Sequence, residues 1–273
     1  MITKKYKIID NIKVFIENVP EDHQDYNARG LDNLYKQEEK HFWFIARKEF
    51  ILKNIKKYIN QNERIIEVGA GTGNVSRYLM KNGYQNIAVG EMHYNGLRYA
   101  KNYGIQECYQ FNLIDVPFEE EFDAVCMFDV LEHLEDDELA LKNVYKMLKT
   151  NGKVIITVPA HMWLWGEIDR ISGHKTRYNK RELEEKLKIT GFDIIFSKYF
   201  FITIVPLLFL RKILYKDDGQ RIETNDVVNI DIGINKFVNT VLLFICRLEN
   251  RLIKILPNFC GGSLLVIGIK KCE

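Results

Sequence analysis

Short apolar runs alternate with amphipathic stretches through the middle of the chain, and this alternation predicts the fold. Short apolar runs predict strands at 64–68, 86–90, 107–111, 122–128 and 153–158, and the last of these runs is rich in β-branched residues. Apolar residues recur at helical spacing in the intervening segments 74–82, 95–103 and 136–148. Strands and helices that alternate in this way form a parallel sheet with helices on both faces, so we expect an α/β protein.

The flanking segments predict additions to this core. Residues 1–30 are polar and irregular, whereas residues 31–59 contain an aromatic cluster followed by apolar residues at helical spacing. Later segments predict a helix over 180–190, a strand over 192–199, a helix over 237–256 and a last strand over 263–269. We therefore expect a seven-stranded, mostly parallel sheet. Its parts are an N-terminal helical cap (1–60), a core (61–200), a helical insertion or cap (201–260) and the final strand of the core sheet (261–273).

The composition excludes few classes of function. The chain has 273 residues and a formal net charge of +2, so its total charge indicates neither a polyanion-binding surface nor an acidic tail. Its five cysteines lack the spacing of zinc ligands and predict reduced thiols, as in a cytoplasmic protein. No uninterrupted apolar run follows the N-terminal lysines, which argues against a secretory signal. The apolar stretch 199–210 is too short to span a bilayer.

A glycine-rich turn is the main candidate for a binding site. The strand that ends at Glu67 continues into the turn residues Gly69, Ala70, Gly71 and Gly73, and a helix is expected directly afterwards. Glycines let the backbone turn sharply and approach a ligand closely, and the helix N-terminus offers free amide groups. Dinucleotide-binding enzymes use a similar turn with a third glycine three residues after the second. This sequence has Asn74 or Ser76 at the corresponding position, so a dinucleotide site fits poorly.

Residues 65–73, with the sequence IIEVGAGTG, resemble the first motif of class I methyltransferases that depend on S-adenosylmethionine (SAM). The other motifs of that family follow in order: Glu91 at the end of the second strand, the segment 110–118, and the exit of the fourth strand at 129–134. The resemblance covers residues 40–200. It implies a Rossmann-like fold and an enzyme that takes a methyl group from SAM.

The resemblance also implies particular cofactor contacts. The Glu91 carboxylate would accept hydrogen bonds from the ribose hydroxyls. Asn112 stands where the family usually has aspartate, and its amide oxygen would accept a hydrogen bond from the adenine amino group. Arg47, in a helix expected to fold over the cofactor, would meet the methionine carboxylate of SAM. The full set of cofactor-binding candidates is Trp43, Arg47, Glu67, Gly69, Ala70, Gly71, Gly73, Glu91, Met92, Asn112, Leu113, Phe128 and Asp129.

Three histidines are the candidates for catalysis. His133 follows the fourth strand, at the place where the resemblance puts the SAM sulfur, and imidazole can remove a proton near neutral pH. His161, at the end of the fifth strand, and His174, in the loop beyond it, are the other two. The alternative for His133 is a packing or helix-capping role.

Asp129, Glu132 and His133 form a D-x-x-E-H pattern, which on a helix would share one face. Some family members, such as small-RNA 3′-end methylases and certain quinone-pathway O-methylases, hold magnesium with a similar E-x-x-E-H set. The pattern is therefore a candidate for magnesium bound to a diol or catechol-like acceptor, with His161 as a further ligand. Because V-L-E-H also occurs in members that need no metal, we assign no metal ligands.

The loop at 159–178 is expected at the mouth of the site, because ligands of open α/β sheets bind outside the carboxyl ends of the strands. Its two tryptophans offer apolar walls, and His174 and Arg177 could hold a carboxylate, a phosphate or a sugar hydroxyl. Alternatively, Asp169 and Arg177 pair with each other and the tryptophans belong to the core. The pattern of this loop resembles a bacterial methyltransferase subgroup linked to cell-surface glycans, lipids or secondary metabolites.

These features favour methylation of a small-molecule, glycan or lipid-linked acceptor, with oxygen as the preferred atom. The apolar stretches 200–210 and 241–246 adjoin basic residues and predict either a packed cap or peripheral contact with the inner face of the membrane. Two other interpretations remain: a SAM-binding accessory or sensor protein without turnover, and a nucleotide-dependent oxidoreductase. A nucleic-acid partner is not expected, since no basic run with interleaved aromatics is present.

Overall fold

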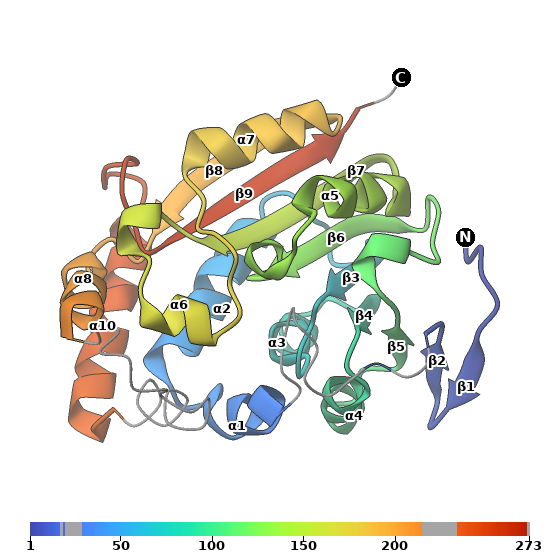
Figure 1. Cartoon of the computed structure of the whole chain (residues 1–273), viewed down its shortest axis with the longest axis horizontal. Coiled ribbons are helices and arrows are strands. Elements are labelled where there is room, and N and C mark those ends of the chain that lie inside the picture. The colour runs from blue at the N-terminus through green and yellow to red at the C-terminus, as the bar shows by residue number, and fades with distance from the viewer. Residues whose placement is uncertain (17–18, 20–28, 215–233, 272–273) are drawn as a thin grey trace.

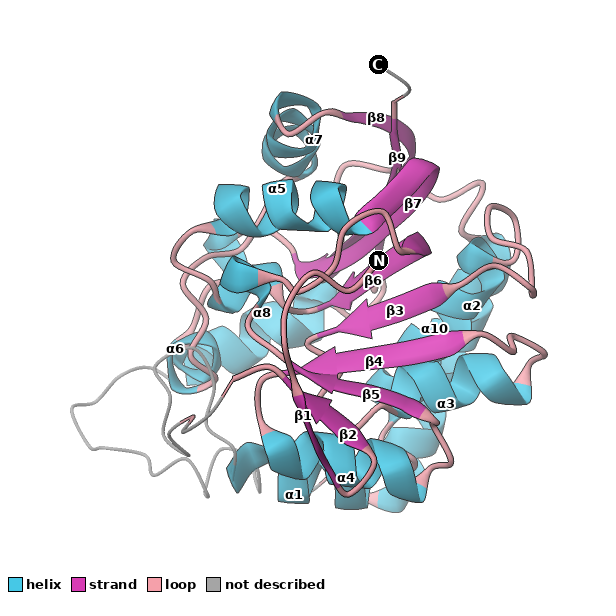
Figure 2. Cartoon of the chain, turned by 90° about the vertical axis from the view of Figure 1, so that its right-hand side faces the viewer, coloured by secondary structure: helices cyan, strands magenta, loops and turns pink. Residues whose placement is uncertain are grey.

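The computed structural model of the chain describes residues 1–16, 19, 29–214 and 234–271. Its strands form one mixed sheet in the order β1-β2-β5-β4-β3-β6-β7-β9-β8, and helices cover both faces (Figure 1 and Figure 2). The α/β class expected from the alternating pattern is confirmed. The expected number of strands is too small, because the sheet has nine strands instead of seven.

Five parallel strands form the centre of the sheet. In spatial order they are β5 (Glu107–Gln110), β4 (Ile87–Glu91), β3 (Ile65–Val68), β6 (Phe122–Phe128) and β7 (Leu148–Pro159). Beyond β7 lie two antiparallel strands, β9 (Ser263–Lys270) and then β8 (Phe192–Phe200). All seven of these strands were predicted from the hydrophobic pattern. The central strands β3, β4 and β6 are buried along nearly their whole length, which explains their nearly continuous apolar runs, whereas β8 lies at the edge of the sheet.

The two additional strands come from the N-terminal segment, and they correct the expectation that residues 1–30 are irregular. β1 (Lys7–Ile9) and β2 (Ile12–Val14) form a hairpin whose turn residues, Asp10 and Asn11, have φ angles of 49° and 59°. Asp and Asn tolerate this left-handed backbone, so they suit a two-residue hairpin turn. Because β2 pairs with β5, Ile12 and Val14 are buried, and the hairpin extends the sheet at that edge.

Helices from different parts of the chain cover the two faces of the sheet (Figure 2). One face is covered by α2 (Phe42–Ile55), α3 (Asn74–Lys81) and α4 (Tyr94–Asn102), and the other by α5 (Asp137–Met147) and α7 (Lys180–Ile189). The helical region expected at 31–59 is divided into α1 (Arg29–Gln37) and α2. The division falls at His41, whose ring nitrogen Nδ1 accepts a hydrogen bond from the backbone N–H of Trp43 and caps α2.

The segment between β8 and β9 contains α8 (Val205–Leu214) and α10 (Lys236–Leu252), in the place where a helical insertion is predicted. α10 is held by Glu249, a buried residue whose carboxylate accepts backbone hydrogen bonds from Ile202 at 3.0 Å and Thr203 at 2.7 Å. Within the described part of the chain, no helix is both long and apolar enough to cross a membrane.

Candidate functional site

The turn after β3 gives the site its shape. Gly69, Gly71 and Gly73 have positive φ angles of 64°, 54° and 79°. A Cβ atom on Gly69 would lie 2.6 Å from Val130 Cγ2, so this position requires both a left-handed backbone and the absence of a side chain. The turn thereby brings backbone amide groups to the N-terminus of α3, as the sequence predicts.

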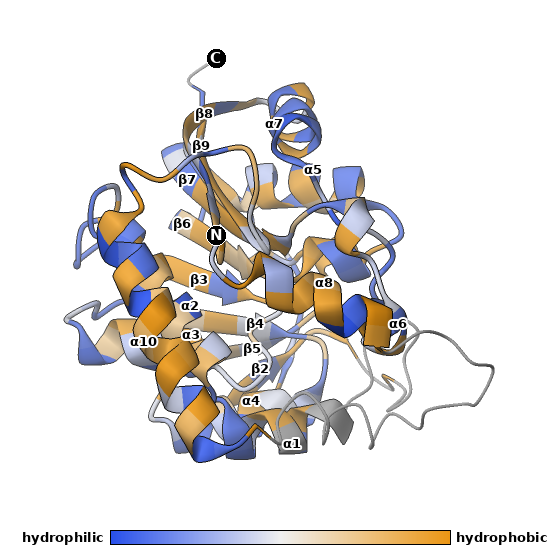
Figure 3. Cartoon of the chain, turned by 90° about the vertical axis from the view of Figure 1, so that its left-hand side faces the viewer, coloured by the Kyte–Doolittle hydropathy of each residue, from blue (hydrophilic) through white to orange (hydrophobic). Residues whose placement is uncertain are grey.

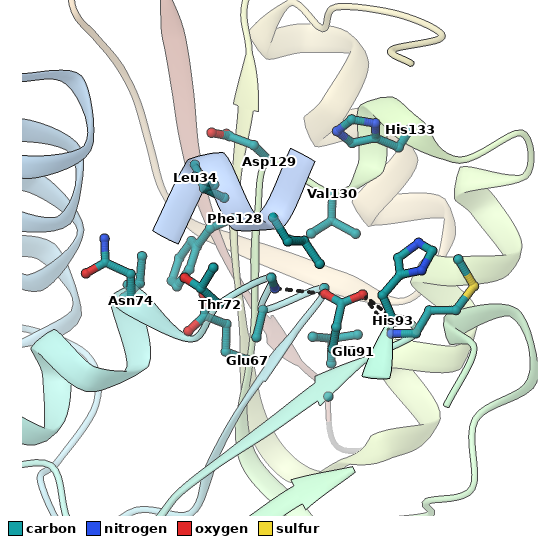
Figure 4. A pocket seen from close by; sticks show the side chains of 18 of the residues that line it. Leu34, Glu67, Thr72, Asn74, Glu91, His93, Phe128, Asp129, Val130 and His133 are labelled. Atoms are coloured by element: carbon teal, nitrogen blue, oxygen red, sulfur yellow. Dashed lines mark hydrogen bonds between the residues drawn. The ribbon is translucent and has the colours of Figure 1, made fainter. Parts of the chain in front are cut away.

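A cavity of about 240 Å³ lies against this turn, at the carboxyl ends of β3, β4 and β6 (Figure 4). This is the edge at which open α/β sheets bind ligands. Most of the predicted cofactor-binding residues line the cavity. They are Arg47, Glu67, Gly69, Ala70, Gly71, Glu91, Met92, Asn112, Leu113, Phe128 and Asp129.

Two predicted cofactor contacts, Trp43 and Gly73, do not line the cavity. Trp43 packs against Phe201, with ring centroids 4.2 Å apart, because the chain after β8 covers the first turn of α2. Gly73 caps α3, and a Cβ atom there would meet Ala100 Cβ at 3.0 Å. In both cases the structure shows packing between elements of the protein where a ligand contact is expected.

Glu91 is held at the end of β4 by the glycine turn itself. One carboxylate oxygen accepts the backbone N–H of Gly71 at 2.8 Å, and the other accepts those of Met92 at 2.8 Å and His93 at 3.1 Å (Figure 4). These bonds fix the carboxylate at the cavity wall. The ribose-binding candidate therefore has a defined position before any ligand arrives.

Glu67 lies deeper, below the turn. Its carboxylate accepts the backbone N–H of Ser76 at 2.8 Å and also the Ser76 hydroxyl. Burial raises the pKa of Glu67 to about 7, although these hydrogen bonds oppose the shift. Near neutral pH the group is thus divided between its neutral and charged forms.

Arg47 and Asp129 form an ion pair on another wall. Asp129 follows β6 with a φ angle of 59°, and the Thr157 hydroxyl donates to its carboxylate at 2.9 Å. While Nη1 of Arg47 bonds Asp129, the Nε group of Arg47 is buried and has no acceptor among the described residues. A buried donor without an acceptor is costly, so this wall suits an anionic ligand group.

Sequence reasoning misses the wall contributed by α1 and the residue just beyond it. Leu31, Leu34 and Glu38 all line the cavity. Burial raises the pKa of Glu38, whose carboxylate accepts the hydroxyls of Thr72 at 2.6 Å and Tyr103 at 3.1 Å. The spacing of three and four residues between Leu31, Leu34 and Glu38 marks one helical face, and that spacing is the signal that could have found them.

His133 and His174 form a pair beside the cavity. His133 lies in the short 3₁₀ helix η2 (Leu131–His133) and lines the cavity, and the ring of His174 lies edge-on to it with centroids 4.8 Å apart. His174 Nδ1 is 2.8 Å from an Asp169 oxygen, to which Arg177 Nε also donates at 2.8 Å. Burial alone would raise the pKa of Asp169, but His174 and Arg177 together lower it. The Asp169–Arg177 pair, one of the two alternatives that the sequence predicts for this loop, is therefore present.

His161 lies apart from this pair and does not line the cavity. Its ring stacks on Tyr199 of β8 with centroids 4.7 Å apart, and burial lowers its pKa. Its backbone N–H donates to Tyr178 at 3.0 Å, where the loop returns to the end of β7. The surroundings of His161 thus indicate packing of the loop onto β8.

Glu132 is fully buried, and among the described residues neither of its carboxylate oxygens has a hydrogen-bond partner. Burial, together with the nearby charge of Asp129, raises the pKa of Glu132 well above its usual range. One ligand atom from each of Glu132, His133 and His174 lies within 4.8 Å of the others. The cluster that could hold a metal ion therefore differs from the expected D-x-x-E-H set with His161. Asp129 pairs with Arg47 and His161 packs on β8, whereas His174 joins Glu132 and His133.

Comparison with known proteins agrees with the geometry of this edge. A family model described as "Methyltransferase domain" matches residues 35–196, more than half of the chain. The ubiquinone biosynthesis O-methyltransferase of Rickettsia canadensis is 25% identical over 167 residues, which cover 54% of this chain and 71% of that protein. The sterol 24-C-methyltransferase of Clavispora lusitaniae is 26% identical over 174 residues, covering 56% and 46%.

A solved structure gives the same fold. Phosphoethanolamine N-methyltransferase 2 of Haemonchus contortus, in complex with SAM, aligns with a TM-score of 0.53 at 18% identity. The alignment covers 81% of this chain and 52% of the other chain. The names of the two similar sequences specify oxygen and carbon as the methylated atom, so the sequence similarity leaves the acceptor atom open.

Proposed function

The chain belongs to the class I SAM-dependent methyltransferases, and from this premise we propose that it methylates an oxygen atom of a small-molecule, glycan or lipid-linked acceptor. The observation that carries the proposal is the position of His133, which lines the cavity at the glycine turn and also touches His174 outside it. His133 thus lies between the cofactor cavity and a second imidazole, and both imidazoles can accept a proton. That arrangement suits transfer to a hydroxyl, because the oxygen must lose a proton.

The charges of the cavity support one orientation of SAM. The cofactor carries a positive sulfonium, an ammonium and a carboxylate, and the cavity presents the four carboxyl groups of Glu38, Glu67, Glu91 and Asp129 with one guanidinium, that of Arg47. The methionine carboxylate would meet the free Nε donor of Arg47. The carboxylates on the other walls would favour the positive sulfonium over the neutral sulfide of the product.

The opposite end of the cavity suits the nucleoside. Glu91 would accept hydrogen bonds from the ribose hydroxyls, because its carboxylate is already fixed by the turn. Asn112 caps the 3₁₀ helix η1 (Leu113–Asp115), and its amide oxygen accepts the Ile114 N–H at 2.9 Å. The second lone pair of that oxygen would accept the adenine amino group. Met92 and Leu113 would supply apolar contacts to the base.

The chemical step is a direct displacement. The acceptor oxygen attacks the SAM methyl carbon, an O–C bond forms, and the C–S bond breaks with its electron pair left on sulfur. His133 would take the hydroxyl proton, and the Asp169–His174 hydrogen bond would hold the neighbouring ring in place. His161 has no part in this step.

A second candidate function, metal-assisted O-methylation, is favoured by one specific observation. The buried Glu132 carboxylate lacks a hydrogen-bond partner within the described ranges and faces two imidazoles, so it fits a divalent cation. One carboxylate with two imidazoles suits manganese, iron or zinc better than magnesium, which prefers oxygen ligands. Such an ion, held by Glu132, His133 and His174, would lower the pKa of a bound acceptor hydroxyl.

The test is transfer from methyl-labelled SAM to a panel of phenols, small acids, cell-surface sugars and lipid-linked intermediates, with added magnesium or manganese and with a chelator. We expect a labelled product methylated on oxygen. Chelator-insensitive turnover supports the histidine base, whereas turnover restored by metal in the wild type and absent from Glu132→Gln supports the metal site. A product methylated on nitrogen or carbon, or tight SAM binding without any labelled product, would overturn the proposed acceptor chemistry.

A further inference from the structure

The C-terminal helical insertion exposes an apolar stripe along the whole length of α10 and just beyond it. The stripe consists of Phe237, Val241, Phe244, Leu248, Leu252 and Ile255. Its members recur at spacings of three and four residues, so they share one face of the helix. Phe237, Phe244 and Ile255 are 76%, 68% and 80% exposed, although the opposite face of α10 packs on α2 through residues such as Cys246.

α8 adds a second exposed apolar surface on the same side of the molecule. Figure 3 shows apolar residues along both helices on this side. On α8 the exposed apolar residues are Leu207, Phe209, Leu210, Ile213 and Leu214. α8 also contacts the loop that follows β7 (residues 160–178, the acceptor loop). Phe209 lies 6.1 Å from Trp163 between ring centroids, and Lys212 donates to the Trp163 carbonyl at 2.7 Å. The apolar surface thus reaches the loop beside the site.

On the two described helices, basic side chains accompany this apolar surface and exposed acidic side chains do not. The described residues of 205–214 and 236–262 contain the basic residues Arg211, Lys212, Lys236, Arg247, Arg251 and Lys254. Their single acidic residue is Glu249, which is 2% exposed and accepts backbone hydrogen bonds. Arg247 pairs with Glu49 of α2, whereas Lys236, Arg251 and Lys254 are exposed. Within these described ranges, the solvent-facing side of α8 and α10 is therefore apolar and cationic.

We propose that α10 and α8 dock on an anionic lipid surface, with the apolar stripe inserted among the acyl chains and the basic residues at the headgroups. An exposed apolar face bordered by lysine and arginine is the pattern that interfacial helices present to such a surface. A second copy of the chain fits less well, since a twofold contact through this face would bring the cationic residues of both copies together. The inference is independent of the methyl acceptor, because it rests on α8 and α10 alone.

The experiment measures flotation of the full chain with vesicles of phosphatidylcholine alone and of phosphatidylcholine mixed with phosphatidylglycerol. We expect binding to the mixed vesicles that weakens as salt is added. Phe244→Gln with Leu248→Gln should lower the partition coefficient roughly ten- to hundredfold, because two apolar side chains lose their insertion. Arg251→Gln with Lys254→Gln should lower it on the order of thirtyfold for mixed vesicles and little for neutral ones.

Ile189→Gln is the matched control. Ile189 is 66% exposed at the end of α7, away from the insertion, so its replacement should leave flotation unchanged. Circular dichroism and SAM titration should be unaltered in all three variants, which separates loss of docking from unfolding and from failure of the cofactor site. The proposal is overturned if the wild type fails to float with mixed vesicles or if the α10 variants float as it does. It is equally overturned if light scattering shows a dimer that Phe244→Gln with Leu248→Gln dissociates without any vesicle binding.

Discussion

The cofactor edge (residues 67–73 with the ends of β4 and β6) and the acceptor loop (residues 160–178) lie at the same edge of the sheet, but they use their polar groups differently. At the cofactor edge, strand ends hold polar groups toward an open cavity, and the Nε group of Arg47 has no acceptor within the described ranges. In the acceptor loop, the polar groups bind one another. For example, the Asp169 carboxylate accepts hydrogen bonds from the Gly166 backbone N–H, the His174 ring and the Arg177 guanidinium.

The difference shows which parts of the site are prepared for a ligand and which are scaffold. Arg177 also donates from Nη1 to the Ala160 carbonyl at 3.2 Å, and the His161 ring stacks on Tyr199. A different group could still hold a ligand. Glu132 and His133 of the D-x-x-E-H segment and His174 of the loop have ligand atoms within 4.8 Å of one another. Chemistry on the acceptor side should therefore depend on these three residues and on Asp169, which positions His174, and should tolerate a change at His161.

The largest expected effect tests whether His133 takes part in the reaction while His161 only packs the loop onto β8. His133→Ala should lower kcat for the acceptor found in the labelled-SAM panel by roughly a hundredfold to ten-thousandfold, the contribution of a positioned general base. SAM affinity measured by calorimetry should stay nearly constant. His161→Phe preserves the stacking on Tyr199 and should retain wild-type kcat. Equal losses in both variants would show that His161 contributes to the reaction as much as His133 and that the division is wrong.

The next effect concerns the cofactor edge alone. Gly69→Ala places a Cβ atom against Val130, which lines the cavity, and forces a left-handed alanine, so SAM affinity should fall by up to about a hundredfold. Gly104→Ala is the matched control, because Gly104 has a φ angle of 87° with no atom within 4 Å of the added Cβ. Both variants should lose about 1 kcal/mol of stability from the left-handed alanine. Gly69→Ala should lose more because of the contact with Val130, and only this variant should lose SAM affinity. Comparable SAM affinities in the two would remove the steric argument for Gly69.

The contrast between the two regions also explains how much the sequence could predict. The central strands, the glycine turn and Glu91 follow from local rules: β-branched runs form strands, and a strand end followed by glycines forms a ligand-binding turn. The N-terminal hairpin follows a local rule as well, the Asp10–Asn11 turn. It is missed because each of its strands has only three residues, too few to show periodicity.

The roles of side chains in the cap and the acceptor loop depend on contacts between distant segments. Trp43 and Arg47 are four residues apart on α2, yet Phe201 covers Trp43 while Arg47 reaches Asp129. His161 and His174 are both plausible catalytic residues by position. The structure stacks the first on Tyr199 of β8, away from the cavity, and places the second against the ring of His133. No local pattern contains this information, because the partners come from elements more than 30 residues away in the chain or from the closure of the loop.

A smaller effect sharpens the assignment of Arg47. Arg47→Met removes the buried donor proposed for the methionine carboxylate, so SAM affinity should fall roughly tenfold, the value of a charge-assisted hydrogen bond. Arg247→Met is the control, since Arg247 pairs with Glu49 on the outer side of α2. Calorimetric titration of both variants with SAM and with its decarboxylated analogue makes the comparison direct. The analogue should bind Arg47→Met and the wild type alike, and a tenfold difference between them would place the carboxylate elsewhere.

The last effect is one on stability rather than on ligand binding, and it concerns Glu67, a buried acid whose carboxylate accepts hydrogen bonds from Ser76. Because burial raises the pKa of Glu67 from its usual value to about 7, the folded state binds a proton more tightly than the unfolded chain does. The resulting stability is fully present below about pH 4.5 and is lost as the pH rises through about 7, with a total on the order of 3 kcal/mol. Glu67→Gln keeps an acceptor for the Ser76 N–H and cannot titrate. In denaturant unfolding without SAM, the free energy of the wild type minus that of Glu67→Gln should therefore decrease across this pH range. A difference that stays constant would mean that Glu67 is as well solvated by Ser76 and the turn as a carboxylate in water, and the cofactor edge would then carry a full charge at every pH above 5.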